Sequence, residues 1–343
     1  MQPEESVAVA AGRPPVLVTG ATGFAGGHLA LRLRRLGHPV RALVRPTAHT
    51  AHLQAAGVEL LVGDLCRPDD VLRAAEGVAI IYHIAAVYRT AGHPDSYYRA
   101  VNVGGTEHVL AAAERHRVAR TVHCSTIGVH GDVKEIPCTE DSPFNPGDIY
   151  QETKLEGELK AQAAFAAGLP GVVFRPAGMY GPGDLRFLKL FKTIFDRRFR
   201  MFGSGETFYH LVYVDDLVDG ILLCGTHPAA LGRTYILAGE RWVTLNELAG
   251  EIAAALGVPP PKGRLPYWPL AASAVVCEAL CKPLGIEPPL HRRRASFFVK
   301  HRAFSIARAQ QELGYAPKVT VAEGVRRTAA WYLEHGHLGR KAA

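Results

Sequence analysis

Short apolar runs alternate with stretches of helical periodicity through the first half of the chain. The runs are nearly continuous in Val, Ile and Leu, which is typical of strands in a parallel sheet that is covered on both faces. We predict strands at residues 15–20, 39–45, 58–65, 79–86, 120–126 and 171–178, with helices at 24–36, 97–116 and 148–167. This order predicts an α/β fold, a Rossmann-type doubly wound parallel sheet.

The alternation ends after Gly178. Residues 184–200 are basic and amphipathic, with apolar side chains at helical spacing, and predict a helix. Further along, the pattern predicts a helix capped near Asp215, a strand at 233–240 and a helix at 244–257 that opens with a capping box of Thr244 and Glu247.

A chain of 343 residues holds one large domain or two unequal ones. We expect a Rossmann domain followed by a smaller C-terminal α/β substrate lobe, part of which returns to the sheet. The expected boundaries are a mobile tail at 1–13, the Rossmann domain at 14–178, the lobe at 179–336 with its returning segment near 209–238, and a tail at 337–343.

The composition is that of an ordinary globular protein, 48% hydrophobic and 21% charged. Neither a signal peptide nor a run of ~18 uncharged apolar residues is present, so we expect a cytoplasmic protein. The six cysteines are scattered without a completed His/Cys ligand set, which predicts free thiols and no metal site. The net charge of +7 favours anionic partners, although it also serves general solubility.

Three glycines follow the first predicted strand and open the first predicted helix. Gly20, Gly23 and Gly26 form a G-x-x-G-x-x-G pattern. Glycines let the backbone approach a pyrophosphate, and a helix start offers free N–H groups to it. The strand–loop–helix context therefore predicts a dinucleotide site, with a tight turn that binds no ligand as the alternative.

Arg45 ends the second predicted strand, nineteen residues after Gly26. Dinucleotide-binding proteins often place an acid about 20 residues past the glycines to hold the ribose 2′-hydroxyl. An arginine there suits a 2′-phosphate, so the sequence favours NADP(H), with NAD(H) beside a surface arginine as the alternative. Asp64, after the third strand, is placed either to accept from the adenine amino group or to cap a helix.

Tyr150 and Lys154 lie four residues apart at a helix start and so share one helical face. A nearby ammonium favours the phenolate form of a tyrosine, which lets Tyr150 exchange a proton with a substrate hydroxyl. The preceding strand ends in Ser125 and Thr126, and either hydroxyl is suited to hydrogen-bond the substrate oxygen.

The sequence resembles the extended short-chain dehydrogenase/reductases over about residues 14–335. The motifs that carry this resemblance are TGATGFAG (19–26), GDL (63–65), HIAA (83–86), VNVGGT (101–106), STIGVHG (125–131), YQETK (150–154), RPAGMYGPGD (175–184) and YVDDL (213–217). The resemblance implies hydride transfer between a nicotinamide and a secondary alcohol or ketone. It implies a catalytic set of Thr126, Tyr150, Lys154 and Asn102, with Ser125 as the rival of Thr126.

For the cofactor, the resemblance implies contacts from the glycine loop and from the ends of the later strands. The implied residues are Gly20, Thr22, Gly23, Phe24, Ala25, Gly26, Arg45, Asp64, Leu65, Ala85, Ala86, Asn102, Tyr150, Lys154 and Pro176. A helix kink or cap remains the alternative role of Asn102.

Three activities of the superfamily compete. Ile127 and Gly128 follow Thr126 where the sugar-nucleotide dehydratases carry an Asp-Glu pair, so dehydration is disfavoured. Epimerases, which hold NAD tightly, commonly have an arginine just before the YVDD-like segment; this chain lacks it, although Arg233 remains available for a phosphate. The chain looks closest to the 3β-hydroxysteroid and dihydroflavonol branches, which implies an apolar substrate. A dinucleotide-binding sensor without activity is a further alternative, disfavoured because Tyr150 and Lys154 are both present.

The segment 265–302 combines an apolar stretch that contains a single acid, Glu278, with the basic and aromatic sequence HRRRASFFVKHR (291–302). Peripheral contact with an anionic membrane is one interpretation, and packing on the substrate lobe is the other. Nucleic acid is not an expected partner, because the cofactor motifs account for the rest of the chain. Many relatives pair through helices beside the tyrosine, so we expect a homodimer.

Overall fold

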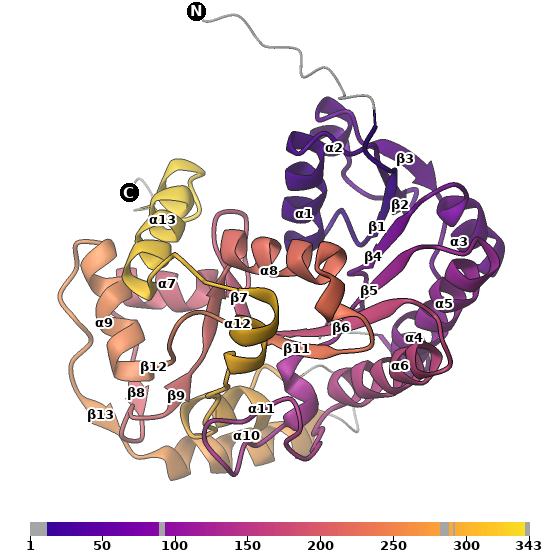
Figure 1. Ribbon diagram of the computed structural model, residues 1–343. Helices are drawn as coiled ribbons and strands as arrows, with labels where there is room; N and C mark the ends of the chain where they lie inside the picture. Colours follow the sequence, from indigo (N-terminus) through magenta and orange to yellow (C-terminus); the bar gives the residue numbers. More distant parts are fainter. Residues whose placement is uncertain (1–11, 89–92, 282–287, 291, 340–343) are drawn as a thin grey trace, which may run out of the picture.

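The computed structural model of the protein describes residues 12–88, 93–281, 288–290 and 292–339 (Figure 1). At its centre is a seven-stranded sheet in the order β11-β6-β5-β4-β1-β2-β3, in which every neighbouring pair is parallel. The predicted doubly wound α/β fold is confirmed. The strands are β1 (Val16–Thr19), β2 (Val40–Val44), β3 (Glu59–Val62), β4 (Ile80–His83), β5 (Arg120–Cys124), β6 (Gly171–Pro176) and β11 (Thr234–Leu237).

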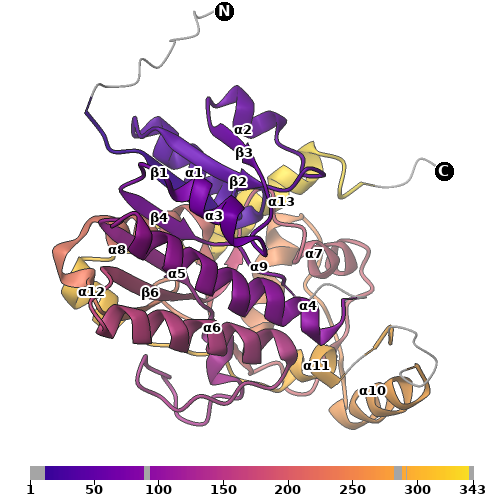
Figure 2. The ribbon, with the colours of Figure 1, turned by 90° about the vertical axis from the view of Figure 1, so that its right-hand side faces the viewer.

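Helices cover both faces of this sheet (Figure 2). Side chains alternate along β1, where Val18 packs into a core with α1 and α8 and Leu17 packs into the opposite core with α3 and α5. α6 lies beside α5 over β6. The covering helices are α1 (Phe24–Arg35), α3 (Pro68–Ala75), α5 (Gly105–Arg115), α6 (Ile149–Ala166) and α8 (Val214–Thr226), with the short α2 (Ala51–Ala55) beside α1.

A second apolar core lies in the C-terminal lobe, between α7, α9 and α13. The lobe returns to the central sheet twice, because α8 packs on α1 and β11 pairs with β6. Its helices are α7 (Leu188–Phe195), α9 (Leu245–Ala255), α10 (Tyr267–Cys281), α11 (Arg292–Ala295), α12 (Ala307–Leu313) and α13 (Val321–Glu334). Its short strand pairs are β7 (Gly178–Tyr180) with β10 (Leu211–Tyr213), β9 (Phe208–Tyr209) with β12 (Val243–Thr244), and β8 (Met201–Phe202) with β13 (Arg264–Leu265).

Several predicted boundaries are wrong. The helix expected at 184–200 is only α7, because Asp184 holds a turn before it by accepting the backbone N–H of Arg186, and Arg197 after it has a positive φ of 57°. Tyr213 caps α8, so Asp215 lies in its first turn, where the helix dipole favours an acid. By contrast, the Thr244 hydroxyl caps α9 as predicted, accepting the Glu247 N–H.

Two further boundaries differ from expectation. The helix expected at 97–116 begins earlier, as α4 (Asp95–Arg99), and continues through a π-helical turn, η1 (Ala100–Gly104), into α5. Residues 337–339 are not a tail, since Leu338 is buried in the lobe core. The remainder of the expected tails, 1–11 and 340–343, lies outside the described residues, as do 282–287 and 291 of the segment 265–302.

Candidate active site

The glycine loop closes tightly between β1 and α1. Gly20 has a φ of 75°, and a Cβ at this position would lie 2.7 Å from the backbone nitrogen of Ala85. A Cβ on Gly26 would lie 2.2 Å from the carbonyl oxygen of Gly20. Neither position admits a side chain, so the loop brings α1 directly against the carboxyl ends of β1 and β4.

The start of α1 offers its backbone N–H groups to an anion. Gly23 is the N-cap, no side chain caps the helix, and its first turn has no acidic residue. Thr22 and Gly23 are exposed, whereas Phe24 is half-buried and Ala25 is buried. Free N–H groups and the positive end of a helix dipole bind phosphate. Together with the close backbone approach at Gly20, this start fits the pyrophosphate of a dinucleotide.

Arg45 and Asp64 lie at the same edge of the sheet as the glycine loop, because each follows the carboxyl end of a strand, β2 and β3 respectively. Both residues are exposed. The Asp64 carboxylate accepts the backbone N–H of Cys66 at 2.9 Å, and the N-cap of α3 is Arg67. The helix-capping alternative for Asp64 is therefore wrong.

The remaining cofactor residues predicted from the sequence differ in exposure. Ala85 and Ala86 follow β4; Ala85 is half-buried and Ala86 is exposed. Pro176 is buried at the end of β6. Leu65 is buried in the core with α3 and α5, and a Cβ on Gly105 would lie 2.6 Å from its Cδ2 atom. The Leu65 side chain is therefore part of the core.

The first two turns of α6 carry the tyrosine and the lysine. Asp148 caps this helix by accepting a backbone N–H at 2.9 Å. Lys154 is buried, and its Nζ donates to the carbonyl oxygen of Cys124 at 2.6 Å. Burial lowers the pKa of Lys154. Tyr150 is buried as well, with its ring centroid 5.0 Å from that of Tyr88 in an edge-on arrangement.

The two hydroxyls at the end of β5 have different partners. The Thr126 oxygen accepts the Gly128 N–H at 3.0 Å, which leaves its own proton for a further acceptor. Ser125 is buried and donates to the carboxylate of Glu158. The Ser125 proton is therefore used by Glu158 in the interior. The Thr126 hydroxyl can still donate its proton at the carboxyl edge of the sheet.

Glu158 belongs to a buried ion pair that the sequence analysis did not single out. Its carboxylate accepts from Arg175 at 2.6 Å, and both side chains are almost wholly inaccessible. Arg175 also donates to the Glu140 carbonyl at 2.8 Å and contacts His130 Nε2 at 2.9 Å. The pair joins α6 to β6, and the hydrogen bond from Ser125 links it to the residue that follows β5. One signal was available, because Glu158 follows Lys154 at the same four-residue spacing that links Tyr150 to Lys154.

A directed chain of hydrogen bonds runs through the interior from β1 to α5. The Ala85 N–H donates to the Thr19 hydroxyl at 3.3 Å, and Thr19 lies 2.8 Å from His83 Nδ1. His83 Nε2 lies 3.1 Å from the Thr106 hydroxyl, which donates to the Asn102 carbonyl at 2.8 Å. Since Thr106 donates its proton to Asn102, the bond between Thr106 and His83 requires Nε2 to be the donor. Burial lowers the pKa of His83 to about 3, so the ring is neutral at neutral pH and its Nδ1 accepts from the Thr19 hydroxyl.

Asn102 lies in the π-helical turn, where its side chain binds a neighbouring loop. Its Oδ1 accepts the Val87 N–H at 2.8 Å, and its Nδ2 donates to the Thr153 hydroxyl at 3.0 Å. The π turn is the helix irregularity that the sequence left open. Asn102 therefore holds the segment after β4, which carries Ala85 and Ala86, against α6.

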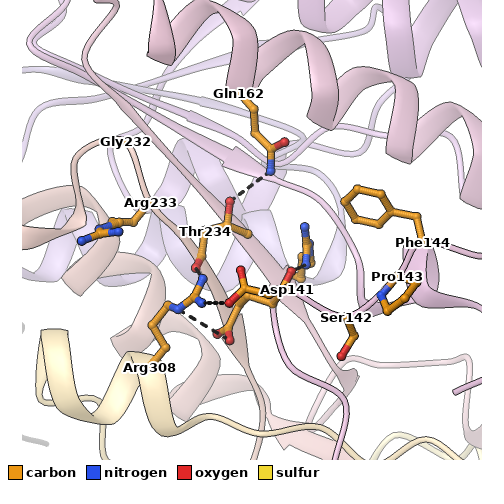
Figure 3. Close-up of a pocket in the computed structure, with 11 residues that line it drawn as sticks. Asp141, Ser142, Pro143, Phe144, Gln162, Gly232, Arg233, Thr234 and Arg308 are labelled. Carbon is orange, nitrogen blue, oxygen red and sulfur yellow. Dashed lines mark hydrogen bonds and ion pairs between the residues drawn. The ribbon is translucent and has the colours of Figure 1, made fainter. Parts of the chain in front are cut away.

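A polar cleft of about 480 Å³ lies at another part of the molecule, beside α6 and β11 (Figure 3). Arg308 there forms ion pairs with Glu140 and Asp141, and Arg233 pairs loosely with Glu312, at 3.9 Å. Arg233 precedes β11 and so lies at the amino edge of the parallel sheet, opposite the glycine loop. This position does not support the suggested role of Arg233 toward a phosphate of a nucleotide-sugar substrate, because Tyr150 and the glycine loop lie at the other edge.

All six cysteines are free thiols. Within the described ranges, no group of three or more His, Cys, Asp or Glu side chains is placed to hold a metal ion. The search for membrane spans, limited to the same ranges, finds no helix both long and apolar enough to cross a bilayer.

The strand order, the glycine loop and the Tyr-Lys helix together define a Rossmann-fold nucleotide-binding protein of the extended short-chain type. The chain belongs to the NAD dependent epimerase/dehydratase family, whose model matches residues 16–238. It is an NAD(P)-dependent oxidoreductase.

Two curated relatives are similar over nearly the whole chain. The 2-alkyl-3-oxoalkanoate reductase of Stenotrophomonas maltophilia (strain K279a) is 32% identical, over 92% of this chain and 98% of the relative. The 3 beta-hydroxysteroid dehydrogenase/Delta 5-->4-isomerase of Mycobacterium tuberculosis (strain CDC 1551 / Oshkosh) is 31% identical, over 93% of this chain and 90% of the relative.

Two solved structures are similar as well. The crystal structure of gox2253 has a TM-score of 0.82 and 31% identity, and the match covers 95% of this chain and 100% of that one. UDP-glucuronic acid 4-epimerase from Bacillus cereus, solved in complex with NAD, has a TM-score of 0.74 and 22% identity over 94% and 99% of the two chains. At that identity the second likeness concerns the fold alone.

Proposed function

We propose that the chain transfers a hydride between NADP(H) and the secondary alcohol or ketone of an apolar small molecule, using Thr126, Tyr150 and Lys154. The main support is the buried Lys154, held on the Cys124 carbonyl one helical turn from Tyr150. When bound, the nicotinamide supplies the hydride acceptor or donor at its C4 atom. All other steps belong to side chains of the protein.

Tyr150 is the acid/base in this proposal. An ammonium beside a phenol favours the phenolate, so Lys154 makes Tyr150 a better base at neutral pH. The Tyr150 oxygen takes the proton of an alcohol on oxidation and returns it to the ketone oxygen on reduction. Thr126 orients that oxygen by donating its remaining proton, while the buried Ser125 keeps its bond to Glu158.

The names of two relatives and one aromatic side chain support an apolar substrate. The two curated relatives carry names of a 2-alkyl-3-oxoalkanoate reductase and of a steroid dehydrogenase/isomerase. In addition, the Tyr88 ring lies edge-on to Tyr150 and is 44% exposed, so it presents an aromatic surface beside the proposed acid/base.

The first experiment identifies the nucleotide released from denatured purified protein and measures affinities for NADPH and NADH. We expect tighter NADPH binding, and Arg45→Ala should lower the NADPH preference about 10–100-fold, since a charged hydrogen-bonded pair contributes roughly 1.5–3 kcal/mol. Arg35→Ala, which removes an equal charge from the last turn of α1, serves as the control. Stoichiometric, tightly held NAD would instead support the epimerase alternative.

The second experiment separates an enzyme from a dinucleotide sensor. Tyr150→Phe should lower kcat roughly 10²–10⁴-fold on an apolar ketone while the affinity for NADPH stays within a factor of two or so. Thr126→Val should lower kcat more than Ser125→Ala does. Unchanged turnover in Tyr150→Phe would remove the proposed catalytic role.

We also propose a homodimer that pairs through the helices beside Tyr150. Leu159 on α6 is 47% exposed, which supplies an apolar contact at the surface of that helix. Light scattering during size exclusion tests this proposal: Leu159→Asp should convert a dimer to a monomer, and a wild-type monomer at all concentrations would refute it.

A further inference from the structure

α10 is apolar almost all round, and much of its apolar surface faces outward instead of into the lobe. Its exposed residues recur at helical spacing and form one outward stripe, made of Trp268, Ala272, Ser273, Val275, Val276, Ala279 and Leu280, of which Ser273 alone is polar. Trp268 is 72% exposed and Leu280 is 65% exposed. Ala274 is the one buried residue of the helix.

The single acid of α10 points away from this stripe. Glu278 is only 12% exposed and forms an ion pair with Arg292 of α11 at 3.1 Å. The backbone N–H of Arg292 donates to the same carboxylate at 2.8 Å. The outward side of α10 therefore carries no charge, although the helix lies at the surface and projects from the body of the lobe (Figure 2).

Basic residues surround the apolar stripe. Residues 257–304 contain eight Lys or Arg and two acids, so most of the net charge of +7 comes from this part of the sequence. Lys262 and Arg264 are exposed on the segment that precedes α10, while the exposed Arg292 that follows it is paired with Glu278. An exposed apolar surface with a tryptophan and flanking cations is the combination that interfacial membrane segments present to anionic lipid.

We propose that α10 and its basic flanks bind the surface of an anionic lipid bilayer, with the stripe Trp268–Leu280 buried at the headgroup boundary. The helix does not span: its 15 residues cover about 22 Å, less than the ~30 Å hydrocarbon core. A second copy of the chain fits this surface less well. A two-fold interface would bring the same basic flanks together, whereas anionic headgroups neutralise them.

Co-sedimentation of the full-length protein with vesicles tests the proposal. Vesicles of phosphatidylcholine with about 30% phosphatidylglycerol should bind the wild type at least ten-fold more tightly than vesicles of phosphatidylcholine alone. Raising the salt from 0.05 to about 0.5 M should weaken the binding. The fluorescence of Trp268, one of three tryptophans, should shift to the blue on binding.

The decisive variant is Trp268→Ser combined with Leu280→Ser, which should reduce vesicle binding at least ten-fold. Leu231→Ser combined with Leu333→Ser removes two other exposed leucines (46% and 44%) and should leave binding unchanged. Both double variants alter exposed side chains, and NADPH binding verifies that they fold. Because binding is read without turnover, the result is independent of the proposed function.

Two outcomes would overturn the proposal. The first is equal vesicle binding by the wild type and the Trp268→Ser, Leu280→Ser variant. The second is no vesicle binding by the wild type; if the same variant then dissociates a dimer, the stripe is assigned to a second copy of the chain.

Discussion

α6 and α10 are helices of similar length with opposite arrangements of polarity. α6 turns Lys154 and Glu158 inward, where each has a hydrogen-bonding partner. α10 turns Trp268 and Leu280 outward and its acid inward. Buried charges and exposed apolar stripes both have a free-energy cost, so each is informative when it occurs. We propose that the buried groups of α6 order the catalytic set and that the exposed groups of α10 contact lipid.

The largest expected effect concerns the buried ammonium of α6. Lys154→Met keeps a similar volume but removes the charge, so Tyr150 loses the group that favours its phenolate. We expect kcat/KM to fall roughly 10²–10⁴-fold, with the fall smaller at high pH, where Tyr150 ionises without help. A pH–rate profile of both proteins is the measurement. An unchanged profile would mean that Lys154 is buried for stability alone.

The next effect compares a buried with an exposed ion pair on the same helix. Glu158→Ala leaves the Arg175 charge buried without its partner and should lower the free energy of unfolding by about 3–5 kcal/mol. Glu156 pairs with Arg99 at the surface, where Glu156→Ala should cost about 0–1 kcal/mol. Denaturant unfolding measures both. Equal losses of unfolding free energy would show that the buried pair contributes no more to stability than the exposed pair does.

The interior beneath α6 should also give the protein an acid-sensitive stability. The pKa of His83 falls from its usual 6.5 to about 3 on burial, so between these values the unfolded chain binds a proton that the folded one does not. The free energy of unfolding therefore falls as the pH drops below 6.5, by about 2 kcal/mol at pH 5 from this group. Burial lowers the pKa of His123 in the same way and adds to the fall.

His83→Gln isolates that contribution. Removing the histidine should make the decline in unfolding free energy between pH 7 and pH 5 shallower, even though the variant is less stable overall. Urea titrations at several pH values measure the slope. If the slope of the variant equals that of the wild type, His83 is protonated in the folded state.

The smallest effect is expected on α10. Val276 is 56% exposed, so Val276→Ser should change the free energy of unfolding by less than about 0.5 kcal/mol. Val109, fully buried on α5, is the contrast, and Val109→Ser should cost several-fold more, because it buries a hydroxyl in an apolar core. Similar losses at both positions would mean that α10 is packed against protein in solution.

The sequence by itself determined the elements whose signals are local. The glycine spacing, the near-continuous apolar strands and the Tyr150–Lys154 spacing each depend on neighbours within one or two turns. They were sufficient for the fold class and for placing the glycine loop between the first strand and the first helix. Boundaries were predicted less well where they depend on single turns, as at Arg197 after α7 and at the π turn around Asn102.

Only the tertiary structure decided which polar residue meets which partner. Ser125 and Thr126 are equivalent in the sequence, yet packing gives one to Glu158 and leaves the other with a free donor. Arg233 is an available cation in the sequence, but parallel pairing places it at the opposite edge of the sheet. His83 finds its partners on β1 and α5, and Arg175 finds its carboxylate partner on α6. Such contacts join residues that are far apart along the chain. The local sequence pattern does not specify them, because they form only when the elements pack together.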